Sequence, residues 1–521
     1  MRRMRPWIEL GFFVLVLAVL YWTSRERFFY DPGTFWHTKT GQVILKRGFI
    51  TTDPFTFTQA DRTWIPTQWL AEVGMALAHS RLGLDGVLWA ALLIIAAFFA
   101  WLSGRYTAAG CHPLLTAIFL VLVFAASCYH YHARPHLITM VFLGLLMGML
   151  ADVEAGRTSL VRLFWLVPFF VLWVNLHGGV LGGMVTFGLA GIGWGLLFLL
   201  KQESPIKSWR DAGVVGLVGL LSAATVFVNP YGLSMLETWR DILRQDLPRI
   251  ISEHRPLSLE NPEGWGILIT ALIYFILLSG TLPRRPRVVW LIPLFWLVQA
   301  CLRIRNGPLF AVTAGVALAD LLPHCRWFLA LAKRSDLYVP PAAESPAAAE
   351  RLADHPWLLL LAIPFLFPAP FHGGLVLDRE HWPIELLEQL NAELNAPGAM
   401  IYNDDLYGGF LIYFTPQARI FIDDRCELHG DELLLTYVQA LRGPPALTAE
   451  AMNSWIHRHH LTLALTRADS AVAKYLETRR DWSVIGQTGA APEKRVLLFK
   501  RKEPWNGKPT LNFVLTRLAC L

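Results

Sequence analysis

Asp31 is the residue in this sequence that is best placed to act as a general base. It directly follows the first long apolar run, is held by the turn-forming residues Pro32 and Gly33, and precedes Trp36 and His37. A carboxylate there can take the proton from an attacking hydroxyl group, while Trp36 and His37 suit stacking on a sugar and hydrogen bonding to it. The alternative is that Asp31 only forms a turn, because Asp-Pro is a common turn starter.

Four polar clusters lie at the ends of other apolar runs, in YHYHARPHL (129–137), WVNLHGG (173–179), VNPYG (228–232) and RIRNGP (303–308). Polar side chains at membrane depth are costly and usually face a cavity, so clusters on one side indicate a single cavity. Arg134 and Arg305 suit a phosphate because guanidinium is planar and always charged. The alternative is that these side chains contact lipid headgroups or neighbouring carbonyl groups. The residues expected to bind substrate are Arg134, His136, Asn175, His177, Asn229, Tyr231, Arg303, Arg305 and Asn306.

The elements that position these residues must be membrane helices. The 521-residue chain is 54% hydrophobic and only 17% charged, whereas soluble domains average about 25% charged residues. Long apolar runs alternate with short charged loops, and each run is about long enough to cross roughly 30 Å of hydrocarbon. Membrane topology explains the formal charge of +6 better than nucleic acid does. We therefore expect membrane lipids, and no nucleic acid, among the partners.

About eleven spans, within a range of ten to twelve, are predicted from these runs. Lys and Arg are more frequent in the connections that are cytoplasmic when the N-terminus is inside, which is the usual bias. This places the N-terminus in the cytoplasm, and loop 24–85, loop 229–263 and the tail from 372 onward outside the inner (plasma) membrane. The predicted spans are 7–23, 86–103, 113–130, 136–151, 162–176, 180–200, 212–228, 264–280, 288–302, 307–324 and 355–371.

The predicted fold is a polytopic α-helical membrane domain over 1–371, with outer loop 24–85, and a small soluble α/β domain over 372–521 that is periplasmic or extracellular. Within the outer loop, residues 37–48 look like an amphipathic helix lying on the surface, and Glu72 lies near the start of a helix over 67–79. The tail has helical patterns at 431–442 and 469–480. Its predicted strands are 399–403, 418–423, 461–466, 482–486 and 495–500.

The pattern DPGTFWHTKTG…GFITTDPFTFT…WIPTQWLAEV resembles the GT-C-type membrane glycosyltransferases, which include the protein mannosyltransferases and the lipid A aminoarabinose transferases. In that family an acidic residue just after span 1 is followed by a surface helix and a second acidic residue. The resemblance implies a GT-C-like membrane domain, a polyprenyl-phosphate-linked sugar donor, inverting transfer and Asp31 as the catalytic base. It also implies that Asp53 is the second carboxylate, supporting the acceptor or a metal ion; the alternative is that Asp53 only forms a turn.

No residue is assigned as a metal ligand, because His130 and His132 lack a carboxylate at matching spacing. A divalent cation, Mg or Mn, is left open, since the outer loop has separated acidic residues rather than an adjacent pair.

Functions from three classes stay open. The favoured one is a glycosyltransferase that moves a sugar to a glycan, lipid or protein acceptor on the outer face, with Trp36, His37 and Glu72 also contacting substrate. The second is a multi-pass transporter or lipid flippase, which inverted repeats and charges within the spans would favour. The third is a non-catalytic membrane protein of an envelope complex. We favour the first because the polar groups gather on one side and no repeat is found.

Overall fold

The computed structural model describes residues 4–244, 254–332, 335–339, 355–489 and 491–502. The chain divides into two compact units. Unit 1 consists of Met1–Thr51 and Ile65–Val376, and unit 2 consists of Thr52–Trp64 and Leu377–Leu521. Unit 2 therefore includes a piece of the loop that the sequence assigns wholly to the membrane domain.

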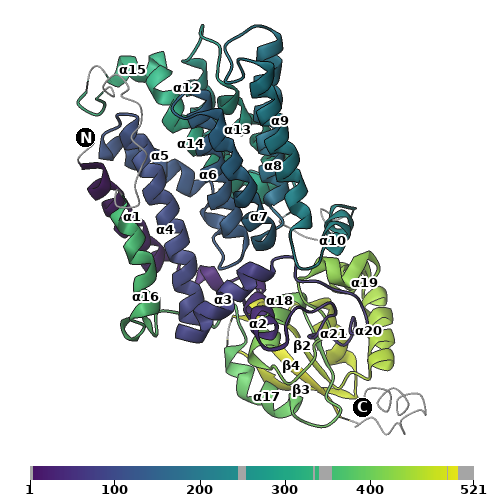
Figure 1. The fold of residues 1–521 in the computed structure, drawn as a ribbon. Helices are drawn as coiled ribbons and strands as arrows, with labels where there is room; N and C mark the ends of the chain where they lie inside the picture. Colours follow the sequence, from purple (N-terminus) through teal and green to yellow (C-terminus); the bar gives the residue numbers. More distant parts are fainter. Residues whose placement is uncertain (1–3, 245–253, 333–334, 340–354, 490, 503–521) are drawn as a thin grey trace. The chain divides into compact units, whose positions relative to one another are not determined.

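Unit 1 is a bundle of helices (Figure 1). Within the described residues, seven helices are long and apolar enough to cross a membrane, and four shorter apolar helices coincide with the remaining predicted spans. The chain is therefore a multi-pass membrane protein. The helices in predicted spans are α1 (Arg5–Ser24), α4 (Leu84–Ala108), α5 (Pro113–Ala125), α6 (His136–Glu154), α7 (Leu166–Leu176), α8 (Val180–Leu199), α9 (Trp209–Ala224), α12 (Pro262–Ser279), α13 (Val288–Leu302), α14 (Gly307–Leu321) and α16 (Ile363–Leu366). Outside the spans lie α2 (Gly33–Arg47), α3 (Trp69–Leu82), α10 (Leu233–Arg244) and α15 (Arg326–Ala332).

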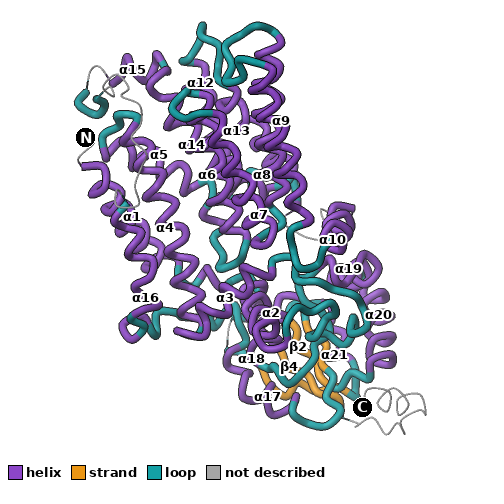
Figure 2. The backbone as a smooth tube through the Cα atoms, in the orientation of Figure 1, coloured by secondary structure: helices purple, strands orange, loops and turns teal. Residues whose placement is uncertain are grey.

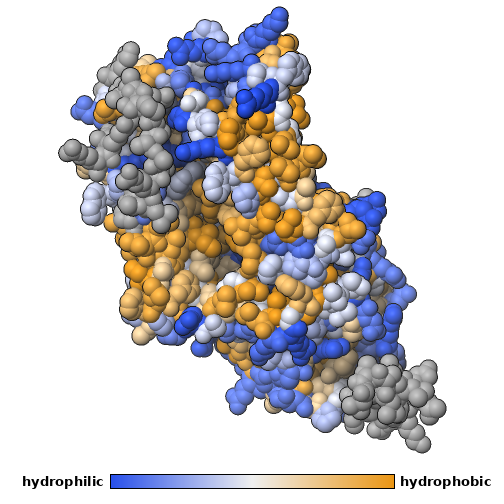
Figure 3. Space-filling view, viewed as in Figure 1, coloured by the Kyte–Doolittle hydropathy of each residue, from blue (hydrophilic) through white to orange (hydrophobic). Residues whose placement is uncertain are grey.

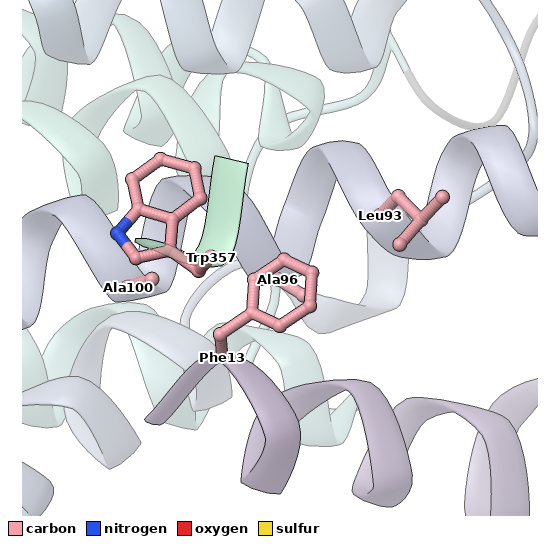
Figure 4. Packing of buried hydrophobic residues seen from close by; sticks show 5 residues of the cluster. All are labelled: Phe13, Leu93, Ala96, Ala100 and Trp357. Carbon is pink, nitrogen blue, oxygen red and sulfur yellow. The ribbon is translucent and has the colours of Figure 1, made fainter. Parts of the chain in front are cut away.

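The first helix is fixed to the bundle by apolar packing. Phe13 of α1 lies against Ala96 and Ala100 of α4 and stacks on Trp357 of η10 (Pro356–Ala362), with ring centroids 6.0 Å apart (Figure 4). The small alanine side chains let α1 approach α4 closely. Apolar side chains also cover much of the bundle's flank, and hydrophilic ones gather at its upper end (Figure 3). This distribution is the one expected for a protein whose flanks face lipid.

Connections predicted to share a side of the membrane lie at the same end of the bundle. At one end, Ala133 N donates to Phe28 O (2.9 Å), Tyr129 Oη donates to Ile304 O (2.6 Å), and Asn175 is bonded to the connection after α9. We call this the Asp31 end. The opposite end, which we call the Asp320 end, joins the connections around Arg105, Asp152, Arg157, Arg287 and Asp320. Successive helices therefore alternate in direction, as the sequence predicts.

A charged network ties the helices together at the Asp320 end. The Asp320 carboxylate of α14 is 2.6 Å from both Arg157 and Arg287 and accepts the indole N–H of Trp290 at 2.8 Å. Asp152 of α6 pairs with Arg105 of α4 and with Arg157, both at 2.8 Å. Because these residues come from α4, α6, α13, α14 and their connections, the network fixes how the helices meet.

Unit 2 holds a four-stranded mixed sheet, and Figure 2 shows its strands in orange. Strand order is β1-β2-β4-β3, with β1 and β2 parallel and the other two pairings antiparallel. The strands are β1 (Ile401–Asn403), β2 (Leu463–Arg467), β3 (Trp482–Gln487) and β4 (Val496–Arg501). The helices are α17 (Leu387–Leu394), α18 (Asp405–Phe414), α19 (Cys426–Arg442), α20 (Pro445–His459) and α21 (Ala471–Thr478). The sheet matches four of the five predicted strands.

The fifth prediction, a strand over 418–423, is wrong. Ile420 makes only an isolated bridge, with Thr56, and its N–H and C=O bond to Phe55 and Phe57. The next backbone groups bond to the Asn403 side chain, which accepts from Phe421 N at 3.0 Å and donates to Ile422 O at 2.7 Å. Because a side chain and a distant loop take these backbone groups, the segment joins no sheet ladder.

The predicted surface helix over 37–48 is also corrected. The structure has α2 at Gly33–Arg47, and most of the side chains in its first three turns are buried. The reason is close packing on α3: a Cβ at Gly41 would run into the carbonyl of Glu72. The helix is therefore part of the packed interior of unit 1, with only its C-terminal turn exposed.

Candidate functional site

Asp31 lies at the N-terminus of α2 and pairs with Arg134. Its Oδ1 accepts the backbone N–H of Gly33 at 2.7 Å, and its Oδ2 lies 2.6 Å from Arg134 Nη1. The N-terminus of a helix favours a negative charge, so α2 and Arg134 stabilise the same carboxylate. The Asp31 side chain is 10% exposed and that of Arg134 is 25% exposed, which leaves the pair reachable from solvent.

The charges around Asp31 keep it ionised. Burial alone would raise the pKa of its carboxyl, but the charges of Arg134 and His132, with the bonds from Arg134 and Gly33, outweigh it and hold the pKa below its ordinary value. An ionised carboxylate is the form that can accept a proton. The predicted general base is thus in the required state at neutral pH.

Three histidines lie near the pair. His136 Nε2 bonds to the carbonyl of His130 at 2.7 Å, and their ring centroids are 4.3 Å apart. His132 lies near both, with ring centroids 6.1 Å from His130 and 6.4 Å from His136. Burial, and then the charges of His132, Arg305 and Arg134, lower the pKa of His130 far below its ordinary value. His130 is therefore a neutral imidazole at physiological pH.

The charges of Arg134 and Arg305 act on the same two imidazoles, those of His130 and His177. Burial, followed by the charges of Arg305 and Arg134, lowers the pKa of His177 to about 3, and both guanidinium groups also act on His130. His177 Nδ1 accepts the N–H of Gly179 at 3.0 Å, which assigns the remaining ring proton to Nε2. Asp31, Arg134, His136, His177 and Arg305 all lie on connections or helix starts at the Asp31 end of the bundle, and we call them the Asp31 cluster.

A second group of predicted residues adjoins this cluster. Trp69 Nε1 donates to Asn175 Oδ1 at 2.7 Å, and Asn175 Nδ2 donates to Val228 O at 2.8 Å. Trp69, Asn175, Val228 and Asn229 line an open groove of about 710 Å³. Asn175 lies only two residues from His177, so the groove and the Asp31 cluster meet at the turn between α7 and α8.

The other predicted residues at this end are placed as follows. Asn229 Oδ1 accepts the N–H of Tyr231 at 2.8 Å and so shapes the turn before α10. Burial, and then the charge of Glu72, raises the pKa of Tyr231, which puts its phenol near that carboxylate. Arg303 is exposed on the connection before α14, and Asn306 donates to Gln299 O at 3.2 Å, closing the end of α13.

Trp36, His37 and Glu72 lie within the packing between α2 and α3. His37 Nδ1 is 2.8 Å from Glu72 Oε1, and the two side chains are 0% and 1% exposed. Trp36 is also buried, with its ring centroid 3.6 Å from that of His37. These rings offer no open face to a sugar in this structure. Their visible role is to hold α2, and therefore Asp31, against α3.

Asp53 belongs to unit 2, whereas Asp31 belongs to unit 1. Its carboxylate is fully buried and accepts from Phe55 N (3.1 Å), Thr56 N (2.8 Å) and Arg425 Nη1 (2.8 Å). Arg425 is equally buried and also pairs with Asp423, 2.5 Å away. This geometry is that of a turn residue joined to a buried ion pair. The structure therefore assigns Asp31 and Asp53 to different compact units, and the role of Asp53 as a second carboxylate stays a prediction.

Among the described residues, no group of three or more His, Cys, Asp or Glu side chains is arranged to hold a metal ion. A divalent cation would therefore need several ligands from a substrate or from water.

Two buried polar residues were missed by the sequence analysis, one near Arg305 and one at the opposite end of the bundle. His254 bonds to Arg305 through its Nε2, and it is the single histidine in the connection between α9 and α12. A lone histidine in this connection was a usable signal. Glu9 is buried in α1 and accepts from Arg5 (2.9 Å), His355 (2.7 Å) and Trp357 (2.9 Å); an acidic residue within an apolar run was a signal as well.

No protein-family model matches the chain, and no curated protein shows significant similarity to it. The side chains of the Asp31 cluster are therefore the guide to function.

Proposed function

We propose that the chain is a GT-C-type membrane glycosyltransferase that moves a sugar from a polyprenyl-phosphate-linked donor to an acceptor hydroxyl. The observation that supports it most is the 2.6 Å contact between Asp31 and Arg134 at one end of a membrane bundle. The reaction needs a proton acceptor and a phosphate-binding cation that can both reach one sugar. The acceptor is a glycan, a lipid or a protein.

The reaction follows from these two groups. The acceptor oxygen attacks the anomeric carbon of the sugar from the face opposite the phosphate, while Asp31 takes the hydroxyl proton. The bond from that carbon to the phosphate oxygen breaks, and the electron pair leaves with the polyprenyl phosphate. Attack from the opposite face inverts the anomeric centre. Arg134 and Arg305 then neutralise the charge that grows on the leaving phosphate.

The ion pair of Asp31 with Arg134 is compatible with phosphate binding. A guanidinium group has five N–H donors in a planar fork, so Arg134 can bond to Asp31 and to a phosphate oxygen together. Arg305 acts on the same imidazoles and adds a second cation to the pocket. The groove lined by Trp69, Asn175 and Asn229 would receive the acceptor beside the cluster.

The proposal includes a location. The excess of Lys and Arg in one set of connections favours a cytoplasmic N-terminus, which puts the Asp31 end on the outer face of the inner membrane. Unit 2 would then be periplasmic or extracellular.

The test is transfer by the purified full-length protein in lipid nanodiscs. Radiolabelled polyprenyl-phosphate hexoses and pentoses serve as donors, and the labelled product is counted for wild type, Asp31→Asn and Asp152→Asn. Asp152 is a matched control, because it also pairs with an arginine (2.8 Å from Arg105) but lies at the Asp320 end. We expect Asp31→Asn to lower the rate by about 100-fold or more and Asp152→Asn to leave it within a few-fold.

Equal transfer by wild type and Asp31→Asn would overturn the proposal. So would donor movement across the bilayer without transfer, which would identify a transporter or flippase. Size-exclusion profiles of both variants show whether each is folded. In cells, Asp31→Asn should cause the lipid-linked sugar to accumulate.

A further inference from the structure

Three groups fix the orientation and the proton of the His177 ring. Trp173 Nε1 donates to Thr139 Oγ1 at 3.0 Å, so this hydroxyl group turns its own proton toward His177 Nδ1, which is 2.8 Å away. The same Nδ1 accepts the backbone N–H of Gly179 at 3.0 Å. Because a ring nitrogen that accepts hydrogen bonds carries no proton, the proton of the neutral imidazole is on Nε2.

Packing holds these three groups in place. Trp173 is fully buried near the end of α7, and its ring stacks on that of Phe170, with centroids 5.9 Å apart. Thr139 lies in the first turn of α6 and is 5% exposed. A Cβ at Gly179 would collide with Thr139 Oγ1 and lie 2.8 Å from His177 Nδ1. The contacts with His177 therefore depend on α6, on α7 and on the absent side chain at Gly179.

The opposite edge of the ring is open. Nε2 makes no hydrogen bond to any described residue, yet it is not a buried atom, because His177 is only partly buried. Burial, followed by the charges of Arg305 and Arg134, holds the pKa of the ring at about 3, so the imidazole stays neutral over the physiological range. The structure thus presents one oriented, uncharged N–H donor that a ligand can reach.

The surrounding charges indicate which acceptor this donor would meet. Arg305 and Arg134 are the two charges that act most strongly on the His177 ring. An acceptor within reach of two guanidinium groups is favoured when it is an anion. A protonated imidazole would add a third positive charge beside them, whereas the neutral ring adds a directional bond without repelling either arginine. A phosphate oxygen fits this combination of donors.

We propose that His177 donates from Nε2 to an oxygen of the polyprenyl-linked phosphate, and that Thr139 and Trp173 are positioning residues that keep the proton on Nε2. The inference rests on the proposed transferase function, which supplies the phosphate. The hydrogen bond strengthens as negative charge grows on the oxygen that leaves the sugar. His177 neither gains nor loses a proton, since the hydroxyl proton goes to Asp31.

Two substitutions of His177 separate the donor from a structural role. In His177→Gln the amide nitrogen takes the place of Nε2, whereas His177→Asn keeps an acceptor near Nδ1 and has no donor at Nε2. Native mass spectrometry of the full-length protein measures binding of polyprenyl phosphate without a sugar. We expect His177→Asn to weaken binding by about tenfold, as for the loss of one hydrogen bond to a charged group, and His177→Gln to restore most of it. The reverse order would overturn the proposal.

Thr139→Val tests the positioning residue, because valine has the shape of threonine without the hydroxyl group. Binding should weaken by about 3- to 10-fold, Thr139→Ser should restore it, and Thr139→Val should add no further loss to His177→Asn. Thr186→Val is the matched control. Thr186 is buried and also accepts from a tryptophan, Trp296 Nε1 at 3.1 Å, but its hydroxyl group donates to Gly182 O. Equal losses in Thr139→Val and Thr186→Val would overturn the positioning role.

The same variants distinguish this inference from the proposed function. Weaker binding of polyprenyl phosphate by His177→Asn, with no sugar transfer by wild type, would refute the transferase and support the contact. Transfer at an unchanged rate and donor KM in His177→Asn would overturn the contact and leave the transferase. A loss of affinity for the sugar-linked donor alone would show that Nε2 contacts the sugar, which also overturns the proposal. If His177→Asn does not fold, the comparison of Thr139→Val with Thr186→Val decides the question.

Discussion

At the scale of single residues, the Asp31–Arg134 pair depends on a glycine. A Cβ built on Gly33 would lie 2.7 Å from Arg134 Nε and 2.8 Å from Asp31 Oδ1. Both distances are shorter than a carbon can approach these atoms. Gly33 is also the first residue of α2, where its backbone N–H bonds to Asp31. The absent side chain thus lets the guanidinium group lie across the start of the helix.

Gly33→Ala tests whether this contact matters for transfer. The methyl group should push Arg134 away from Asp31, while alanine suits a helix better than glycine does by about 1 kcal/mol. We expect transfer to fall by roughly tenfold to 100-fold, since small misplacements cost rates of that order, with thermal stability nearly unchanged. Gly74→Ala on α3, where nothing lies within 4 Å of an added Cβ, is the control. A loss of rate equal in both variants would count against the pair.

Asp404 in unit 2 makes stability depend on pH. Burial raises the pKa of its carboxyl from 3.8 to about 7, although bonds from Arg467 N and Thr466 oppose the shift. The folded unit therefore binds this proton more tightly than the unfolded chain does, so the carboxyl stabilises the fold at low pH. The free energy of unfolding should fall as pH rises from about 4 to about 7 and stay lower above that range.

Asp404→Asn should remove most of this pH dependence. The amide keeps an oxygen for Arg467 N and carries no charge, so the variant should be more stable than wild type at pH 8, by the order of a few kcal/mol. Chemical denaturation at pH 5 and pH 8, followed by a signal from unit 2, measures the difference. The neighbouring Asp405 also has a raised pKa, so some pH dependence should remain. A wild type that is more stable at pH 8 than at pH 5 would contradict the assignment.

At the scale of elements, the ends of the helices are held by charge and their middles by apolar packing. Asp320 on α14 joins Arg157 and Arg287, and its side chain is only 1% exposed. Removing one partner of a buried ion pair leaves the others without compensation. The Asp320 end therefore resists separation of α6, α13 and α14.

Asp320→Asn should lower the free energy of unfolding by about 3 kcal/mol, the low end for a buried pair, because both arginines are partly exposed. Thermal unfolding in detergent, read by circular dichroism, measures the effect. Asp211→Asn is the comparison, since Asp211 is a partly exposed residue in the first turn of α9, and it should change little. Equal melting temperatures for wild type and Asp320→Asn would show that the network does not stabilise the bundle.

Local signals predicted the elements well. A run of apolar residues forms a membrane helix almost whatever its neighbours are, so every predicted span coincides with a helix. The strand prediction for 418–423 was wrong because the partner of this segment, the loop at Thr56, lies far away in the sequence. Likewise α2 has polar residues that looked solvent-facing, and only its packing on α3 buries His37 against Glu72. A local sequence pattern predicts whether a segment is a helix or a strand. Contacts with distant segments decide whether that segment is buried.

For the site, the sequence predicted the positions of the residues but not the contacts between them. Topology placed Asp31, Arg134 and Arg305 at one end of the bundle. The direct bond between Asp31 and Arg134 depends on how the connection after η3 (Cys128–His130) packs on Phe28, which no local signal carries. Asp53 follows Asp31 closely in sequence but belongs to the other compact unit, a division that no local signal in the loop predicts.

At the scale of the whole molecule, the order of synthesis matters. Unit 2 is joined to unit 1 by three backbone links, at 51–52, 64–65 and 376–377. Asp53 and Arg425 form a buried ion pair within unit 2, and 372 positions separate them in the sequence. The ribosome therefore releases the 52–64 segment long before its partner exists, and most of the membrane helices must be made in the interval. A chain that stops before residue 425 lacks the ion-pair partner of Asp53, so its 52–64 segment cannot fold. A cell's proteases can recognise an unfinished copy by this unfolded segment.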